Sequence, residues 1–402
     1  MESVRPILLS FSPKRLLTHC VTSVHKGVEA GRSLLEPFYG QDATKSYFLG
    51  CSLGGRQAVK AADLFPKDFD GIVAGSPALD FNNLYSWRAN FYTITGPSDS
   101  VNFITPTMWQ TTVHDEVLRQ CDSIDGVADG IIEDSSLCHF EPSTLLCKDG
   151  VANSSDCLTR SQVEIVRKIF EPYLWENGTL LFPGMNPGSE ILCAEGLYDG
   201  EPFAYSEHWF RYVVHNNKSW DPATYSLADA EFAEDLNPAG VRTWPSSLSA
   251  FEARGGKMIT FQGGQDNQIT SFNTPRFYDH LATGMDYSYD RMDQFLRFFR
   301  ISGMFHCNSG PGAWVVGQSG GSAAQGPFDR EHNVLAALVE WVEQGVAPDT
   351  ITGTKFLNDS AEMGVSFKRR HCRWPLRNIF VGGNSSDLAS WKCRNMAQTP
   401  IW

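Results

Sequence analysis

The sequence has no apolar stretch long enough to cross a membrane, and basic side chains are fewer than acidic ones. Lys and Arg number 33 against 46 Asp and Glu, which gives a net charge of −13 at pH 7. A spanning helix needs roughly 20 consecutive apolar residues, and nucleic acids and anionic lipid surfaces attract basic proteins rather than acidic ones. The sequence therefore predicts neither a membrane nor a nucleic acid as a partner.

Zinc-type cysteine pairs and an ordinary secretory leader are also missing. None of the ten cysteines forms a C-x-x-C pair, the spacing typical of zinc and redox sites. Ten cysteines are many for a reduced cytosolic enzyme, so we predict that most form disulfides in a secreted, extracellular protein. Residues 1–15, however, are interrupted by proline and charge and do not form the apolar core of a signal peptide. N-glycosylation sequons point to the same compartment and begin at Asn153, Asn177, Asn217, Asn358 and Asn384.

The chain is organised around Lys45–Gln57, where an apolar run stops at glycine, turns at Ser52 and continues as a helix. The centre of this stretch reads G-x-S-x-G. In α/β-hydrolases this pattern follows a strand, opens a helix and holds the serine hydroxyl at the top of the sheet, with the next N–H as an oxyanion donor. Both flanking elements are predicted here. We therefore predict Ser52 as the nucleophile and Leu53 N–H as one oxyanion donor, against the alternative of a structural turn.

A second G-x-S-x-G match lies at Gly317–Gly321. It is followed by a glycine-rich loop rather than a helix. The histidine that follows it, His332, is crowded by Asp329 and Glu331, which leaves no room for a separate acid loop. We predict that Ser319 belongs to a surface loop.

An acid and a histidine follow the serine in the order of an α/β-hydrolase. The apolar stretch Lys257–Phe261 is predicted to be a strand, and Asp266 follows it on a loop. Residues 294–301 form a further predicted strand, and His306 follows on the next loop. Ser52, Asp266 and His306 are therefore the predicted catalytic triad, and for His306 the alternative is a structural imidazole.

The predicted domains are distinguished by whether strands and helices alternate clearly along the chain. Residues 47–75 predict a parallel strand–helix–strand unit, and the pattern returns at residue 257, with a strong helix at residues 330–344. From about residue 80 to 248 the alternation fades, and tryptophan, proline and cysteine accumulate. We predict an α/β-hydrolase domain with a doubly wound, mostly parallel sheet at residues 1–79 and 249–402, and an inserted cap (lid) domain at residues 80–248.

A short loop in the predicted cap carries Asp122, Asp125 and Asp129 among glycines. Carboxylates this close repel one another unless a cation neutralises them, and Ca²⁺ accepts carboxylate and backbone oxygens in flexible geometry. The spacing differs from that of an EF-hand. A calcium site and a solvated acidic turn both remain open at this point.

Taken together, several motifs resemble the fungal and bacterial tannase and feruloyl esterase family. They are G-C-S-x-G-G-R-Q around Ser52, F-D-G-I-V-A-G-x-P after it, the G-x-D loop of Asp266 and the pair His306-Cys307. The match runs from roughly residue 18 to the C-terminus. The resemblance implies a secreted serine carboxylic ester hydrolase acting on phenolic-acid esters, such as ferulate on plant cell-wall polysaccharide or gallate in tannins. The choice between feruloyl and galloyl esters stays open.

The resemblance also implies bonds and ligands. It implies a disulfide between Cys51 and Cys307, and local bridges Cys121–Cys138, Cys147–Cys157 and Cys372–Cys393. Cys20 and Cys193 remain without an assigned partner. It further implies a structural Ca²⁺ bound by the side chains of Asp122, Asp125 and Asp129 and the carbonyls of Val127 and Ile131.

The stretch before the serine is short for such a sheet. Only 51 residues precede Ser52, and residues 16–38 predict a single amphipathic helix. Several strands normally come before the nucleophile, and a loop after one of them supplies the second oxyanion donor. We therefore expect that N-terminal strands are missing from this chain and that the chain as written is poorly soluble and nearly inactive. The alternatives are a silent relative kept as a secreted binding module, or another serine hydrolase such as a peptidase or lipase.

Overall fold

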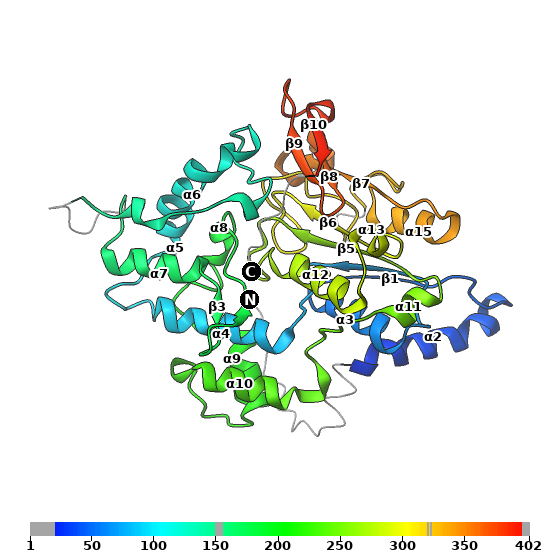
Figure 1. The fold of residues 1–402 in the computed structure, drawn as a ribbon, viewed down its shortest axis with the longest axis horizontal. Coiled ribbons are helices and arrows are strands. Elements are labelled where there is room, and N and C mark those ends of the chain that lie inside the picture. The colour runs from blue at the N-terminus through cyan, green and yellow to red at the C-terminus, as the bar shows by residue number, and fades with distance from the viewer. Residues whose placement is uncertain (1–20, 149–155, 320, 322–323, 396–402) are drawn as a thin grey trace.

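The computed structural model describes residues 21–148, 156–319, 321 and 324–395 (Figure 1). At its centre is a four-stranded sheet in the order β1-β2-β5-β6. The strands are β1 (Tyr47–Cys51), β2 (Gly71–Gly75), β5 (Lys257–Gly263) and β6 (Leu296–Ile301). Every neighbouring pair in this sheet is parallel. The predicted α/β class and the parallel strand–helix–strand unit are therefore confirmed.

Helices cover both faces of this sheet, and successive strand residues face opposite sides. On one face Ile72 and Met258 pack in a cluster with α3 (Leu53–Leu64), α11 (Ser249–Ala253), α12 (Asn273–Met285) and α13 (Tyr289–Met292). On the other face Val73 and Ile259 pack against α15 (Val334–Gln344). The central strand β2 is buried along its whole length and is apolar throughout, as is usual for a strand covered on both faces of a parallel sheet.

Two predicted helices differ in their bounds from the sequence prediction. Helix α2 covers Ser23–Tyr39 and ends at Gly40, whose φ of 73° closes the helix; residues 16–20 of the predicted helix lie outside the described residues. Helix α15 begins at Val334 rather than at residue 330, because the Asn333 side chain caps the N–H groups of Leu335 and Ala336. Within the described ranges no helix has both the length and the apolarity to cross a membrane.

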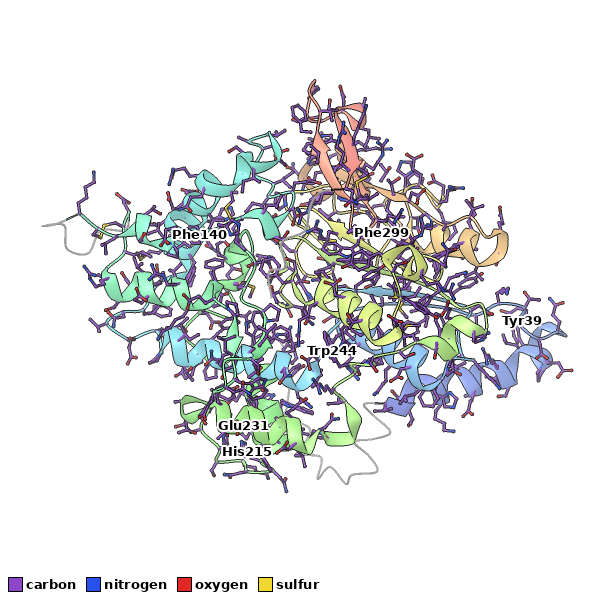
Figure 2. The ribbon with its side chains drawn as sticks, in the orientation of Figure 1. Tyr39, Phe140, His215, Glu231, Trp244 and Phe299 are labelled. Carbon is purple, nitrogen blue, oxygen red and sulfur yellow. A yellow bond between two sulfur atoms is a disulfide. The ribbon has the colours of Figure 1, made fainter. Side chains whose placement is uncertain are left out.

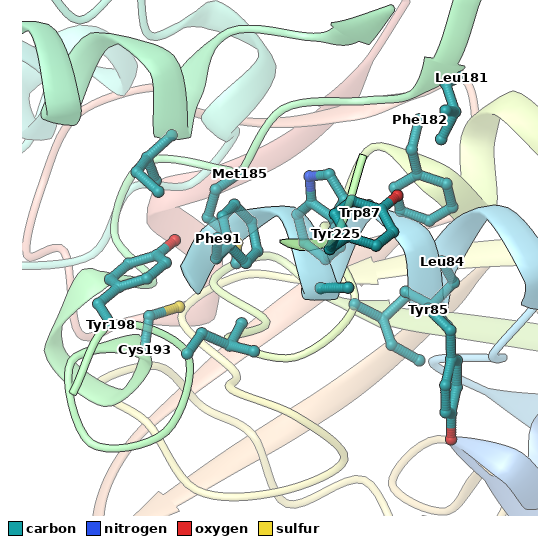
Figure 3. Close-up of a cluster of buried hydrophobic side chains, with 14 of the residues drawn as sticks. Leu84, Tyr85, Trp87, Phe91, Leu181, Phe182, Met185, Cys193, Tyr198 and Tyr225 are labelled. Carbon is teal, nitrogen blue, oxygen red and sulfur yellow. The ribbon is translucent and has the colours of Figure 1, made fainter. Parts of the chain in front are cut away.

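The segment 80–248 is mostly helical and folds around its own core. Its buried cluster takes members from residues 78–241 together with Ile269. Figure 3 shows Trp87 and Phe91 of one helix packed with Phe182 and Tyr198. The helices are α4 (Phe81–Thr95), α5 (Pro106–Met108), α6 (His114–Cys121), α7 (Arg160–Phe170), α8 (Glu190–Cys193), α9 (Ala204–His208) and α10 (Leu227–Leu236), and the strands are β3 (Tyr173–Leu174) and β4 (Leu180–Phe182).

The two ends of this segment lie side by side. Phe81 N–H donates to Arg242 O at 2.9 Å, so the chain entering the segment is bonded to the chain leaving it. The carboxylate of Asp80 is fully buried and pairs with Arg242 at 2.8 Å and with Arg276 of α12 at 2.9 Å. These ion pairs fix the base of the segment against the helix that packs on the central sheet.

Short antiparallel strands complete the chain and lie at the top of Figure 1. Strands β7 (Thr350–Phe356) and β8 (Val365–Cys372) form one pair, and β9 (Arg377–Phe380) and β10 (Trp391–Arg394) form another. Arg369, a buried residue of β8, pairs with Asp129 at 2.9 Å and with Glu133 at 2.7 Å. The C-terminal strands therefore hold the acidic loop that follows α6.

Candidate active site

Ser52 lies at the sharp turn between β1 and α3, as the motif predicts. Its backbone has φ 63° and ψ −120°, a conformation that residues other than glycine rarely adopt. Three backbone hydrogen bonds hold it: Ser52 N–H donates to Gly75 O, and Ser52 O accepts from Arg56 and Ala78, each at 3.0 Å. The serine is therefore held in an unfavourable conformation by the neighbouring strand and loop.

The glycines that permit this turn differ in part from those of the motif. A Cβ atom at Gly50 would lie 2.8 Å from the backbone of Gly54, and one at Gly55 would lie 2.4 Å from Gly75 O. A Cβ at Gly54 would meet nothing within 4 Å. The close approach of strand and helix therefore needs Gly50 and Gly55, and Gly55 lies outside the G-x-S-x-G pattern.

Leu53 is the first residue of α3. The N–H groups of a helix's first turn have no acceptor within the helix. The Leu53 N–H therefore remains available to an oxygen that develops negative charge beside Ser52.

Asp266 and His306 are in direct contact. Asp266 is fully buried on the loop after β5, and its two carboxylate oxygens lie 3.0 and 2.9 Å from His306 Nδ1. One of these oxygens also accepts from the N–H groups of Gln268 and Ile269, each at 2.9 Å. The carboxylate therefore orients the imidazole and leaves Nε2 as the ring nitrogen free to exchange a proton.

Sequence reasoning missed two residues that support Asp266. Gln262 Nε2 donates to Asp266 Oδ2 at 2.8 Å and to Ile269 O at 3.1 Å. The Thr274 hydroxyl donates to Gln262 Oε1 at 2.6 Å, which orients the amide so that its NH₂ group faces the carboxylate. The available signal was a glutamine at the end of a strand that is buried from Met258 onward, four residues before the acid.

The acid loop and the histidine loop are bonded to each other along their backbones. Gln265 N–H donates to Met304 O at 3.0 Å, and His306 N–H donates to the Asn267 side chain at 3.1 Å. A Cβ atom at Gly263 would lie 2.4 Å from Phe305 O. The approach is therefore too close for any residue but glycine at position 263.

A disulfide connects the serine turn to the histidine loop. Cys51 precedes Ser52, Cys307 follows His306, and their Cα atoms are 6.0 Å apart. The predicted pairing is therefore confirmed. The other predicted bridges are also present: Cys121–Cys138, Cys147–Cys157 and Cys372–Cys393. Cys193 is free and buried, and Cys20 lies outside the described residues.

The second G-x-S-x-G match has a different setting. Val315 makes only an isolated bridge to Thr354, and the chain continues as a loop through Gly317 to Ser319. His332 pairs with the neighbouring Asp329 at 3.0 Å. In the described part of the chain Ser319 therefore follows an isolated bridge rather than a strand; the prediction that a loop follows it falls on residues 320, 322 and 323, which lie outside the described residues.

The three carboxylates of the acidic loop after α6 all have contacts within the protein, including Asp125 Oδ1, which accepts from Val127 N–H at 2.9 Å. Asp122 accepts from Gly130 N–H at 3.0 Å, and Asp129 pairs with Arg369 at 2.9 Å. Asp125 Oδ2 is buried and has no hydrogen-bond partner among the described residues. Burial raises the pKa of Asp125 to about 7, although the Val127 N–H bond opposes this shift.

The acidic loop offers carboxylate oxygens and backbone carbonyls as possible metal ligands. Within the described ranges no group of three His, Cys, Asp or Glu side chains converges closely enough to hold one. The unpaired, buried oxygen of Asp125 is nevertheless an acceptor that a cation would satisfy. The donor set of the loop, carboxylates and backbone carbonyls, therefore fits a hard cation such as Ca²⁺.

Comparison with known proteins gives one family. The family model described as "Tannase and feruloyl esterase" matches residues 9–394. Among curated proteins the chain is similar to "Probable feruloyl esterase B-2" of Aspergillus flavus, with 56% identity over 356 residues. That match covers 88% of this chain and 68% of the relative.

One solved structure similar to this chain is a feruloyl esterase, and a more distant one shares the fold. The crystal structure of feruloyl esterase B from Aspergillus oryzae matches with a TM-score of 0.92 and 43% identity, covering 95% of this chain and 76% of that one. Tannin acyl hydrolase from Aspergillus niger matches with a TM-score of 0.75 and 20% identity, covering 95% of this chain and 71% of that one. The second likeness shows a shared fold.

Proposed function

The chain belongs to the tannase and feruloyl esterase family, and we propose that it hydrolyses esters of phenolic acids with Ser52, Asp266 and His306 as its catalytic residues. The observation that carries these roles is the contact of the buried Asp266 carboxylate with His306 Nδ1 at 2.9 Å, on a loop disulfide-bonded to the serine turn. The higher identity to feruloyl esterase B, 43% against 20% for tannin acyl hydrolase, favours feruloyl over galloyl esters.

The proposed reaction has two steps. His306 Nε2 takes the proton from Ser52 Oγ as that oxygen attacks the ester carbonyl carbon, and the Leu53 N–H stabilises the resulting oxyanion. Collapse of this intermediate breaks the ester C–O bond, and His306 returns the proton to the departing alcohol. Water then attacks the acyl-enzyme with His306 as base, which releases the phenolic acid and regenerates Ser52. Asp266 holds the imidazole in the required tautomer throughout.

A substrate panel tests the proposed activity. We expect methyl ferulate to be hydrolysed fastest, methyl gallate more slowly, and a triglyceride and a peptide not at all. Hydrolysis of the peptide or triglyceride alone would favour another class of serine hydrolase. No hydrolysis of any of the four would favour a binding module that keeps only the fold.

We also propose that the protein is secreted, is a glycoprotein, and carries residues 80–248 as a cap beside the catalytic residues. Four disulfides suit an oxidising compartment. The contact of the segment's core with Ile269, three residues after Asp266, supports the placement of the cap. Asn186 of the same segment donates to Gly264 O at 3.2 Å and accepts from Ser271 N–H at 2.9 Å, which further ties the segment to the acid loop.

A structural calcium ion is proposed for the acidic loop. Its ligands would be the side chains of Asp122, Asp125 and Asp129 and the carbonyls of Val127 and Ile131. When bound, Ca²⁺ would supply positive charge to a group of carboxylates of which only Asp129 pairs with a basic side chain in the described part of the chain, and it would take no part in the ester chemistry. The buried, unpaired oxygen of Asp125 supports this proposal.

Removal of calcium is expected to lower the melting temperature of this 402-residue chain by about 3 °C, because an ion present at about 100 times its Kd contributes about 2.7 kcal/mol to the folded state. The measurement is differential scanning calorimetry with and without a chelator. Asp125→Ala should melt at the chelated temperature and should no longer respond to chelator. Protein purified without chelator that contains no calcium by elemental analysis would contradict the site.

Gln262→Leu is expected to lower kcat about 10-fold to 100-fold with little change in KM. The leucine removes the donor to Asp266 Oδ2 and leaves the carboxylate less well held, so the imidazole orientation drifts. The pH dependence of kcat should move as well, because Asp266 and His306 share the altered hydrogen bonds. Thr274→Val should reproduce part of the effect.

Gln268→Ala is the matched control for this test, because Gln268 contacts Asp266 only through its backbone N–H. It should retain the kcat and pH profile of the parent protein. A Gln262→Leu variant with unchanged kcat and pH profile would show that Gln262 has no positioning role.

A further inference from the structure

The turn between β3 and β4 carries the sequence Trp175-Glu-Asn177-Gly-Thr179, which contains a sequon. Gly178 N–H donates to Trp175 O at 2.9 Å, and Trp175 N–H donates to Thr179 O at 2.8 Å. Gly178 has φ 81°, which gives the hairpin the bulge that a residue with a side chain resists. This geometry pairs Trp175 with Thr179 across the hairpin and places Asn177 at the tip between them.

The Asn177 side chain is held ready for modification. Its Oδ1 accepts from the Thr179 N–H at 2.9 Å and from the Thr179 hydroxyl at 2.6 Å. Its Nδ2, the atom to which a sugar is attached in N-glycosylation, makes no hydrogen bond to the described part of the chain. The residue is exposed. Sequon, exposure and free Nδ2 therefore coincide at this tip.

The other described sequons lack the contact between the sequon hydroxyl and the asparagine side chain. Asn358 has its Nδ2 3.4 Å from Met363 Sδ. Asn217 and Asn384 accept from backbone N–H groups two residues on, at 3.0 Å each, without a contact to the sequon hydroxyl. Asn153 lies outside the described residues. Among the described sequons Asn177 therefore has the side-chain geometry that best suits modification.

Trp175 and Asn177 line the same groove. This groove has a volume of about 610 Å³ and lies between the hairpin and α10, with Thr179 and carboxylates on its walls. Trp175 is partly buried against the core of the 80–248 segment, so its indole is held in place. Figure 2 labels Glu231, one of these carboxylates, on α10. A rigid aromatic face beside an attachment point suits the apolar face of a sugar ring, and carboxylates accept hydrogen bonds from sugar hydroxyls.

We propose that Asn177 is N-glycosylated and that its first N-acetylglucosamine packs on Trp175 in this groove. The proposal rests on the secretion proposed above. In the attachment step Asn177 Nδ2 attacks C1 of a lipid-diphosphate-linked oligosaccharide. A new N–C bond forms, the C–O bond to the diphosphate breaks, and the Nδ2 proton goes to a base of the transferase. The attached sugar then stabilises the β3–β4 hairpin by covering the indole.

The test uses protein secreted from a yeast host, with the sequons at Asn153, Asn217, Asn358 and Asn384 changed to Gln so that Asn177 carries the remaining glycan. Peptide mass spectrometry should find Asn177 occupied. An endoglycosidase that leaves one sugar should not change the melting temperature. An amidase that removes the whole glycan should lower it by about 1 °C, a small shift because 402 residues at about 2.1 cal/mol/K each give a large unfolding entropy.

Trp175→Ala is the decisive variant. The amidase leaves Asp at position 177, so the same treatment of Trp175→Ala measures the effect of that charge change alone. We expect little or no drop in melting temperature in Trp175→Ala and a retained drop in Trp175→Phe. A matched protein that keeps Asn384 as its remaining sequon should show no drop.

Two results would overturn the proposal: an unoccupied Asn177, or an equal drop in melting temperature with and without the indole. Neither result bears on ester hydrolysis. Asn177→Gln should retain the kcat of the parent protein, so the failure of the glycan proposal and the failure of the proposed function are separate outcomes.

Discussion

Ser52→Ala and His306→Ala are each expected to lower kcat for methyl ferulate by about a million-fold, the scale seen when either member of a serine–histidine pair is removed. The two side chains act as one unit, because the histidine activates the same hydroxyl that attacks the ester. The double variant should therefore lose little more than either single variant. The measurement is steady-state hydrolysis, with melting curves to show that each variant is folded.

Ser319→Ala is the matched control, since Ser319 lies in the second G-x-S-x-G match. It should retain the full kcat, because no strand leads into Ser319 in the described part of the chain and the nearby His332 pairs with the adjacent Asp329 rather than with an acid from a separate loop. An active Ser52→Ala variant together with an inactive Ser319→Ala variant would reverse the assignment of the nucleophile.

The candidate site could be predicted from the sequence where the chemistry has a local signature. Ser52 carries a turn motif, and Asp266 and His306 each follow an apolar strand. The order of the three along the chain then restricted the choice. The disulfide pairs came from the family resemblance, because nothing local indicates that Cys51 and Cys307, separated by 256 positions, should meet.

The supporting residues could not be predicted in the same way. Gln262 lies near the end of β5, and Thr274 lies 12 positions later at the start of α12. The two residues act through a hydrogen bond between their side chains. Their roles depend on the packing of α12 against β5, and no local pattern encodes that packing. Gly55 was missed for a related reason, since the atom that crowds it, Gly75 O, belongs to the neighbouring strand.

For the fold as well, some features could be predicted from the sequence and others could not. Mainly apolar runs identified β1, β2, β5 and β6, and the run is continuous in β2, which is buried along its whole length. The sequence did not indicate the buried ion pairs of the C-terminal region. Asp134, Arg300 and Arg377 would each be expected at the surface, yet the carboxylate of Asp134 pairs with both arginines. Such charges enter the interior only as mutually neutralising groups, and the pairing depends on the tertiary structure.

Replacing both Cys51 and Cys307 with alanine is expected to lower kcat about 100-fold in protein that still folds at moderate temperature. Ser52 and His306 lie on loops separated by more than 250 positions, and the bridge is the covalent connection between those loops. Without it their relative position can drift, and a displacement of about 1 Å in catalytic geometry costs about 100-fold in rate. The measurement is steady-state hydrolysis well below the melting temperature.

The matched control is the Cys372→Ala and Cys393→Ala pair, which removes a bridge of sequence separation 21 in the C-terminal strands. On the chain-entropy model this control should lose about 3 kcal/mol of stability, and the Cys51–Cys307 pair about 5 kcal/mol. Only the Cys51–Cys307 pair should lose kcat, because only that bridge flanks catalytic residues. If both pairs lost stability while both kept kcat, the backbone hydrogen bonds between the acid and histidine loops, together with the strand contacts of Ser52, would suffice to hold the triad. The bridge would then stabilise the fold without positioning the catalytic residues.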